Sequence, residues 1–298
     1  MATTPPSDAG IEIWYTTDGD PSGEPLLLVM GLGAQYIVWP EAFVARMVDR
    51  GFFVVRFDNR DVGLSTKPDV GALDTAAEIL GALTGTPPTA PYLLTDMADD
   101  AVAVLDALGI DSAHVVGASM GGMIAQTIAI EHRDRVRSLT SIMSTTGDPT
   151  VGAPSPEILG VLLAPAPTTR EEALERGVVT SVAIGSPGLV DEDEARERAS
   201  AAWDRCAYPE GTAHQLLAIV ASPDRTPALR QLDIPTLVIH GDKDPLVTPS
   251  GGEATAAAVP GAEHLVIEGM GHDHAKIFWD RIIDAIHANT AKAAAPAA

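Results

Sequence analysis

A serine lies at the centre of the sequence Gly117-Ala118-Ser119-Met120-Gly121, between an apolar run and a helix-like stretch. The pattern Gly-x-Ser-x-Gly in this context is typical of a sharp turn that raises a serine hydroxyl above the end of a strand. Side chains two positions to either side would collide in such a turn, and the glycines remove them. The turn leaves Ser119 at the amino end of a helix, where N–H groups and the helix dipole favour negative charge. We therefore predict that Ser119 is a nucleophile.

A serine hydroxyl needs a general base, and the chain has eight histidines. In an open α/β sheet the reactive site lies beyond the carboxyl ends of the strands. His272 follows the apolar run at 264–268 and two glycines that allow its imidazole to lie over the sheet edge, so we predict His272 as the base. His274 and His240 lie near the same edge. We expect His274 to face solvent or cap a helix, and His240 to be packed and hydrogen-bonded.

The base needs a carboxylate that fixes its tautomer and stabilises the imidazolium. Two aspartates follow the apolar run at 236–240, in Gly241-Asp242-Lys243-Asp244-Pro245. We predict Asp244 as the partner of His272, because the proline after it stiffens the loop. Asp242 follows a glycine directly, and we expect it to bond the backbone of the turn.

Acyl transfer also needs N–H donors for the oxyanion that forms on the attacked carbonyl. We assign one to the backbone amide of Met120, immediately after the nucleophile. The loop Gly31-Leu32-Gly33 follows an apolar run, and its glycines let the backbone approach closely, so the amide of Leu32 is the second predicted donor. The same glycines would also suit an ordinary tight turn.

The elements that position these residues alternate between strands and helices, which predicts a mostly parallel, doubly wound α/β sheet. Strand-like runs occur at 11–15, 26–30, 52–57, 114–116, 138–143, 236–240 and 264–268, and helix-like stretches at 41–50, 95–108, 120–130 and 276–288. Residues 148–226 show helical pieces and no strand pattern, and they are too many for a loop. We predict a helical cap there, inserted into a core of residues 1–147 and 227–298. The segment Lys67 to Pro91 is either a flexible lid or a long surface connection.

Composition excludes several other classes of protein. The chain has 298 residues and a formal net charge of −22, so its field repels phosphates, and we expect no nucleic-acid partner. One cysteine, Cys206, cannot form an intramolecular disulfide. The first 25 residues contain no Lys or Arg, and no apolar run is long enough to span a bilayer, so we expect a cytoplasmic protein without a membrane span.

Three stretches carry a resemblance to a known family: LLLVMG, VVRFDNRDVGLST and DDAVAVLDALGIDSAHVVGASMGG. They resemble the α/β-hydrolases, and within them the actinobacterial branch that includes aclacinomycin methylesterase. The resemblance implies an α/β-hydrolase fold, a triad of Ser119, Asp244 and His272, and oxyanion amides from Leu32 and Met120. Many relatives have His-Gly where this chain has Met30-Gly31, so a side chain that often orders the oxyanion loop is absent.

The function expected from these residues is hydrolysis of a small-molecule carboxylic ester through an acyl-enzyme, without metal or organic cofactor. The same triad serves C–C hydrolases, lactonases and perhydrolases, and the fold also occurs in non-catalytic ligand receptors. The cluster His272-Asp273-His274 is weak evidence for a metal site. Apolar residues of the cap favour a hydrophobic substrate, and the candidate pocket walls are Ile158, Leu159, Val161, Leu162, Leu163, Trp203 and Leu216.

Overall fold

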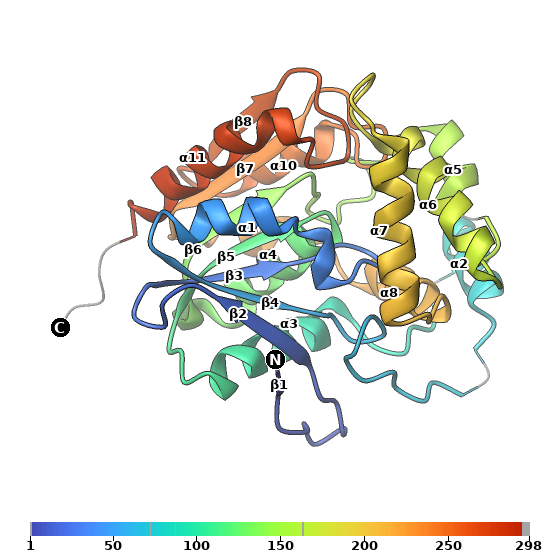
Figure 1. Cartoon of the computed structure of the whole chain (residues 1–298), viewed down its shortest axis with the longest axis horizontal. Coiled ribbons are helices and arrows are strands. Elements are labelled where there is room, and N and C mark those ends of the chain that lie inside the picture. Colours follow the sequence, from blue (N-terminus) through green and yellow to red (C-terminus); the bar gives the residue numbers. More distant parts are fainter. Residues whose placement is uncertain (1, 72, 87, 163, 294–298) are drawn as a thin grey trace.

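The computed structural model describes residues 2–71, 73–86, 88–162 and 164–293, and its described strands form one eight-stranded sheet (Figure 1). The strands are β1 (Ala2–Thr3), β2 (Trp14–Asp18), β3 (Glu24–Val29), β4 (Phe52–Phe57), β5 (Ala113–Ala118), β6 (Val136–Ile142), β7 (Thr236–Gly241) and β8 (Glu263–Ile267). The helices are α1 (Glu41–Val48), α2 (Thr75–Leu83), α3 (Leu94–Ala107), α4 (Met120–Glu131), α5 (Pro156–Leu162), α6 (Arg170–Ile184), α7 (Glu192–Arg205), α8 (Glu210–Ala221), α9 (Thr226–Leu229), α10 (Ser250–Ala258) and α11 (Trp279–Thr290).

The strand order is β1-β2-β4-β3-β5-β6-β7-β8. Strands β1 and β2 pair antiparallel, and every pair from β4 to β8 is parallel. The predicted mostly parallel α/β sheet is thus confirmed. Because β5, β6, β7 and β8 are consecutive parallel neighbours, the loops after β5, β7 and β8 leave the sheet at the same edge.

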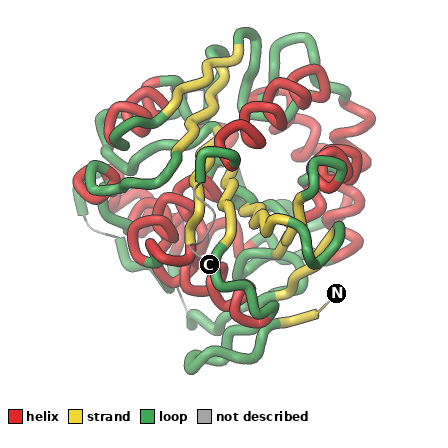
Figure 2. The backbone as a smooth tube through the Cα atoms, turned by 90° about the vertical axis from the view of Figure 1, so that its left-hand side faces the viewer, coloured by secondary structure: helices red, strands yellow, loops and turns green. Residues whose placement is uncertain are grey.

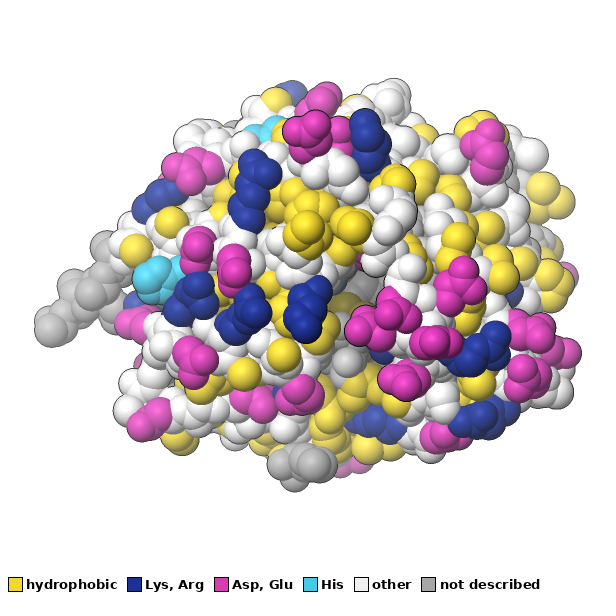
Figure 3. Space-filling model, turned by 45° about the horizontal axis from the view of Figure 1, so that its top comes forward, with side chains coloured by type: hydrophobic (Ala, Val, Ile, Leu, Met, Phe, Trp, Pro, Cys, Tyr) yellow, Lys and Arg dark blue, Asp and Glu magenta, His cyan; other side chains and the backbone are white. Residues whose placement is uncertain are grey.

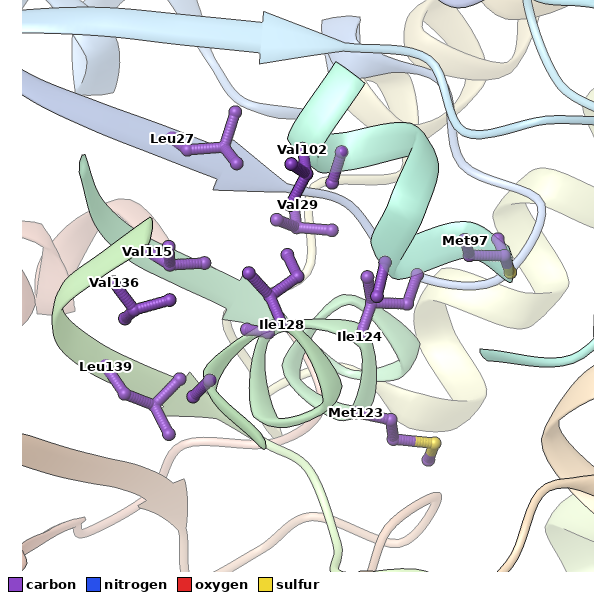
Figure 4. Packing of buried hydrophobic residues seen from close by; sticks show 14 of the residues in the cluster. Leu27, Val29, Met97, Val102, Val115, Met123, Ile124, Ile128, Val136 and Leu139 are labelled. Atoms are coloured by element: carbon purple, nitrogen blue, oxygen red, sulfur yellow. The ribbon is translucent and has the colours of Figure 1, made fainter. Parts of the chain in front are cut away.

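The central strands β3 to β7 are buried along most of their length because both of their faces are covered. Leu26, Leu27, Leu28 and Val29 of β3 are all 0 % exposed. Helices α1 and α11 pack on one face, where Phe43 and Ile283 are fully buried. Helices α3 and α4 cover the other face, where Ile124 and Ile128 lie against residues of β3, β5 and β6 (Figure 4). In Figure 2 the strands run between helices on either side, as the doubly wound prediction requires.

Two differences from the predicted elements have physical causes. Strand β2 covers 14–18 rather than 11–15, because its residues pair with β4 from Tyr15 opposite Phe57 to Asp18 opposite Val54. Helix α10 has the sequence SGGEATAAA, which the sequence pattern does not predict as a helix. Its glycines are required by packing, since a Cβ atom built at Gly252 would lie 2.4 Å from Nδ1 of His240.

Residues 148–226 contain α5 to α8, drawn at the right of Figure 1, and the start of α9. Helix α2, within the Lys67 to Pro91 segment, packs against α8. The division into a core and a cap stays a prediction, and we call residues 148–226 the inserted segment. Two further features concern the molecule as a whole. Among the described helices, none combines the length and the apolar character that crossing a bilayer requires.

Acidic side chains are scattered over the face in Figure 3, with several basic side chains between them.

Candidate active site

Ser119 occupies a strained turn between β5 and α4. Its backbone has φ 58° and ψ −122°, a conformation that costs a residue with a side chain on the order of 1–3 kcal/mol. The flanking glycines make the turn possible: a Cβ atom built at Gly117 would lie 2.0 Å from the carbonyl oxygen of Gly121, and one at Gly121 would lie 2.1 Å from that of Val29. Strain of this kind is concentrated at functional sites. The local geometry is that of the predicted turn.

The loop after β3 lies against the serine. A Cβ atom built at Gly31 would be 3.1 Å from Cβ and 3.6 Å from Oγ of Ser119. Among the described residues, the backbone N–H groups of Leu32 and Met120 donate to no protein acceptor. Two free N–H groups beside a serine hydroxyl can bind an anionic oxygen. The assignment of Leu32 and Met120 to an oxyanion hole stays a prediction.

His272 and Asp244 lie together, as expected from the sequence. Nδ1 of His272 is 2.7 Å from Oδ2 of Asp244, and the two residues are 8 % and 3 % exposed. Oδ1 of Asp244 accepts from the backbone N–H groups of Leu246 and Val247, each at 2.9 Å. Burial acts to raise the pKa of Asp244, but His272, His240 and the N–H group of Val247 outweigh it and lower the pKa to about 2. The carboxylate is therefore charged near neutral pH, and it leaves Nε2 of His272 free to accept a proton.

The serine and the histidine are not directly joined. Among the described residues, no hydrogen bond connects the Ser119 hydroxyl to the His272 ring. The sheet order places the two loops at one edge, and catalytic hydrogen bonds commonly tighten only when substrate is bound. The convergence of all three side chains stays a prediction.

The other residues near this edge have distinct roles. Oδ1 of Asp242 accepts from the backbone N–H of Gly269 at 2.6 Å, so Asp242 ties two turns together and does not contact the histidine. His240 is 1 % exposed, and its Nε2 donates to the carbonyl of Val247 at 2.8 Å. It is packed and hydrogen-bonded, as the sequence indicates. Its Nε2 also lies 3.5 Å from Oδ2 of Asp244.

The expected solvent-facing or helix-capping role of His274 is wrong. Its ring packs 4.9 Å from Trp39 and 6.2 Å from Phe43 between ring centres, and its Nε2 is shielded without a hydrogen-bond partner among the described residues. The residue is half-buried, and its ring packs against aromatic side chains. The residues of the cluster 272–274 also diverge, because Asp273 bonds Ser186 while His272 bonds Asp244.

Burial lowers the pKa of His274 from 6.5 to about 4, which makes stability pH-dependent. In the unfolded chain the imidazole of His274 binds a proton once the pH falls below 6.5, whereas in the folded protein it does so only near pH 4. The contribution of His274 to the free energy of unfolding is therefore fully present above pH 6.5 and is lost as the pH is lowered. Between about pH 7 and about pH 5 we expect the protein to lose roughly 1–2 kcal/mol relative to the variant His274→Phe. Urea unfolding of both proteins at the two pH values measures this difference. An equal pH dependence in both would contradict it.

The inserted segment holds the histidine loop, a feature that sequence reasoning missed. Oγ of Ser186 donates to Oδ1 of Asp273 at 2.6 Å and accepts from the N–H of Gly271 at 2.9 Å. The N–H of His272 donates to the carbonyl of Ile184 at 2.7 Å. Ser186 is fully buried, yet nothing in its sequence surroundings indicates a partner 87 residues away.

The candidate pocket walls in the inserted segment differ in exposure. Ile158 is 5 % exposed and is part of the packed interior, whereas Leu159 is 37 % exposed. Val161, Trp203 and Leu216 are half-buried. Leu163 and the side chain of Leu162 lie outside the described residues.

Comparison with known proteins establishes the family. Residues 24–274 match the family model described as the alpha/beta hydrolase fold. The chain is an α/β-hydrolase. This α/β-hydrolase is 32 % identical to rhodomycin D methylesterase DnrP of Streptomyces peucetius, over 88 % of the chain and 89 % of the relative. It is 28 % identical to 3-oxoadipate enol-lactonase 2 of Acinetobacter baylyi, over 80 % of the chain and 78 % of the relative.

Solved structures show the same fold. An esterase of Thermogutta terrifontis is 26 % identical with a TM-score of 0.69, and the match covers 98 % of this hydrolase and 97 % of that chain. The meta-cleavage product hydrolase CumD of Pseudomonas fluorescens is 20 % identical with a TM-score of 0.75, and the match covers 99 % of this hydrolase and 98 % of that chain. The second likeness carries the fold alone.

Proposed function

We propose that this α/β-hydrolase cleaves carboxylic esters of small to medium-sized hydrophobic substrates through an acyl-enzyme on Ser119. The observation that carries the proposal is the buried His272–Asp244 hydrogen bond of 2.7 Å at the sheet edge where the strained Ser119 turn also lies. The methylesterase relative that spans most of the chain supports the choice of an ester as substrate.

The mechanism follows from these groups. Oγ of Ser119 attacks the ester carbonyl carbon while Nε2 of His272 takes its proton. Asp244 holds the Nδ1–H of His272 and stabilises the imidazolium, and the N–H groups of Leu32 and Met120 bind the oxyanion. His272 then gives its proton to the departing alkoxide, and the alcohol leaves. Water, activated by His272, attacks the acyl-enzyme, releases the carboxylic acid and restores Ser119.

We further propose that residues 148–226 act as a cap over this edge of the sheet. The bonds from Ile184 and Ser186 to the histidine loop support this placement. Exposed apolar side chains on the same segment, including Leu159 at 37 %, favour a hydrophobic acyl or alcohol group.

A panel of p-nitrophenyl esters of graded chain length, with a lactone and a vinylogous diketone for comparison, tests the reaction class. A fluorophosphonate probe, followed by mass spectrometry of the labelled peptide, tests the nucleophile. We expect ester turnover and a label on Ser119 that the variant Ser119→Ala does not take up. Turnover of the diketone alone would favour a C–C hydrolase, and absence of both turnover and label would indicate a non-catalytic receptor.

The close approach of Gly31 to the serine gives a further prediction. The variant Gly31→Ala places a methyl group against Cβ and Oγ of Ser119, beside the proposed oxyanion site. Loss of one oxyanion donor costs about 10²–10³-fold in kcat, and we expect a loss of about that size here, with KM changed far less. Steady-state kinetics measure it. Gly81→Ala is the matched control, since a Cβ atom there makes only an ordinary contact, 3.6 Å from Cβ of Thr86. Unchanged kcat in Gly31→Ala would remove this loop from the oxyanion site.

A further inference from the structure

Gln215, in helix α8 of the inserted segment, joins two loops of the sheet. The residue is 0 % exposed. Its Oε1 accepts from the backbone N–H of Gly33 at 2.8 Å, and its Nε2 donates to the carbonyl of Arg60 at 2.7 Å. Both polar ends of the buried amide are thus used, and their partners lie 182 and 155 residues away in the sequence.

One of these partners belongs to the loop with the free N–H group of Leu32. The N–H of Ala34 bonds the carbonyl of Gly31 at 3.2 Å, which closes a turn with Leu32 and Gly33 at its centre. Gly33 has φ 65°, a conformation that a glycine can leave easily. The bond from Gln215 fixes the peptide plane between Leu32 and Gly33. It thereby limits the torsions of Leu32 and the direction of its N–H relative to Ser119.

The helix is attached to the sheet layer by other contacts as well. Nδ1 of His214 lies 3.2 Å from Oδ2 of Asp61, and a Cβ atom at Gly211 would lie 2.0 Å from the carbonyl oxygen of Asp61. In helix α8, Gln215 therefore bonds the oxyanion loop, whereas the neighbouring His214 bonds Asp61 outside that loop. Variants of these two residues can distinguish an effect on the position of the loop from an effect on the attachment of the helix.

We propose that Gln215 is a positioning residue of the oxyanion hole, supplied by the inserted segment. The proposal rests on the proposed function of Ser119 and Leu32. It means that the inserted segment completes the catalytic machinery as well as covering it. Helix α8 sets the position of one N–H donor without touching the substrate.

The test first establishes that the wild-type protein turns over an ester, and then compares the variants Gln215→Met and His214→Asn on that ester. Methionine keeps the length of the side chain but can neither accept from Gly33 nor donate to Arg60. We expect Gln215→Met to lower kcat about 10- to 100-fold with KM within about threefold, and to weaken binding of a trifluoromethyl ketone by a similar factor. This inhibitor forms a tetrahedral oxyanion on the serine. We expect His214→Asn, which loosens the same helix, to change kcat less than about threefold.

A second variant covers the case in which Gln215→Met does not fold. In Gln215→Glu, a protonated carboxyl can reproduce both bonds, whereas a carboxylate faces the carbonyl of Arg60 without a donor. The ratio of its kcat to that of the wild type should therefore rise as the pH falls. Equal losses of kcat in the Met and His214 variants, or a pH-independent ratio for the Glu variant, would overturn the proposal. An inactive wild type would instead refute the proposed function.

Discussion

The variant Asp244→Asn is expected to lose about 10⁴-fold in kcat on a carboxylic ester while it keeps its fold. Oδ1 of Asp244 accepts two backbone N–H groups, so the oxygen of an asparagine must occupy that side. Its NH₂ group then replaces Oδ2 and faces Nδ1 of His272, which was 2.7 Å from the carboxylate. Because an NH₂ group only donates, His272 must carry its proton on Nε2. That tautomer cannot take the proton of Ser119.

Asp242→Asn is the matched control for this variant. Asp242 lies in the same turn, and its Oδ1 accepts from the N–H of Gly269 at 2.6 Å, a bond that asparagine can keep. We expect kcat within a few-fold of the wild type. Steady-state kinetics and thermal unfolding of both variants decide between the two aspartates. If Asp242→Asn lost more activity than Asp244→Asn, the assignment of the carboxylate would be wrong.

The catalytic candidates could be predicted because their signals are local. Gly117 and Gly121 lie two positions before and after Ser119, and a Cβ atom at either glycine would overlap backbone atoms. Strand β7, which leads to Asp244, is buried at every position, and burial on both faces makes such an apolar run recognisable. Strand β8, which leads to His272, lies at the edge of the sheet with Ile267 as its buried residue, and its apolar residues 265–267 carry the signal. Strand β4 has the predicted bounds, 52–57.

The remaining features depend on contacts between distant parts of the chain. Gln215 bonds Gly33 and Ser186 bonds Asp273, and no spacing rule connects residues 182 or 87 positions apart. Helix α10 contains two glycines that lower helix propensity, and packing against His240 compensates for them. His274 has polar neighbours in sequence but aromatic neighbours in space. Local patterns thus predict the candidate catalytic groups, while the residues that hold them in place emerge only from the tertiary structure.

The second large effect is expected on stability, from the buried pair of Arg60 and Asp100. Nε and Nη2 of Arg60 donate to the two carboxylate oxygens at 2.6 and 2.8 Å, and the side chains are 10 % and 7 % exposed. Burial raises the pKa of Asp100 even with the arginine beside it. The variant Arg60→Leu leaves this carboxylate buried without its partner, which typically costs about 3–5 kcal/mol of unfolding free energy.

The double variant Arg60→Leu/Asp100→Leu should recover much of that loss, because it removes the unpaired charge as well. Lowering the pH should also help Arg60→Leu. A carboxyl whose folded pKa lies above its unfolded value destabilises the fold at high pH, and protonation removes that penalty. Arg170→Leu is the matched control, since Arg170 and Asp204 form a similar two-bond pair whose side chains are 47 % and 56 % exposed. Solvent screens that pair, so its loss should be much smaller. Urea unfolding of the four proteins measures these differences, and a double variant no more stable than Arg60→Leu would show that the isolated charge is not the cause.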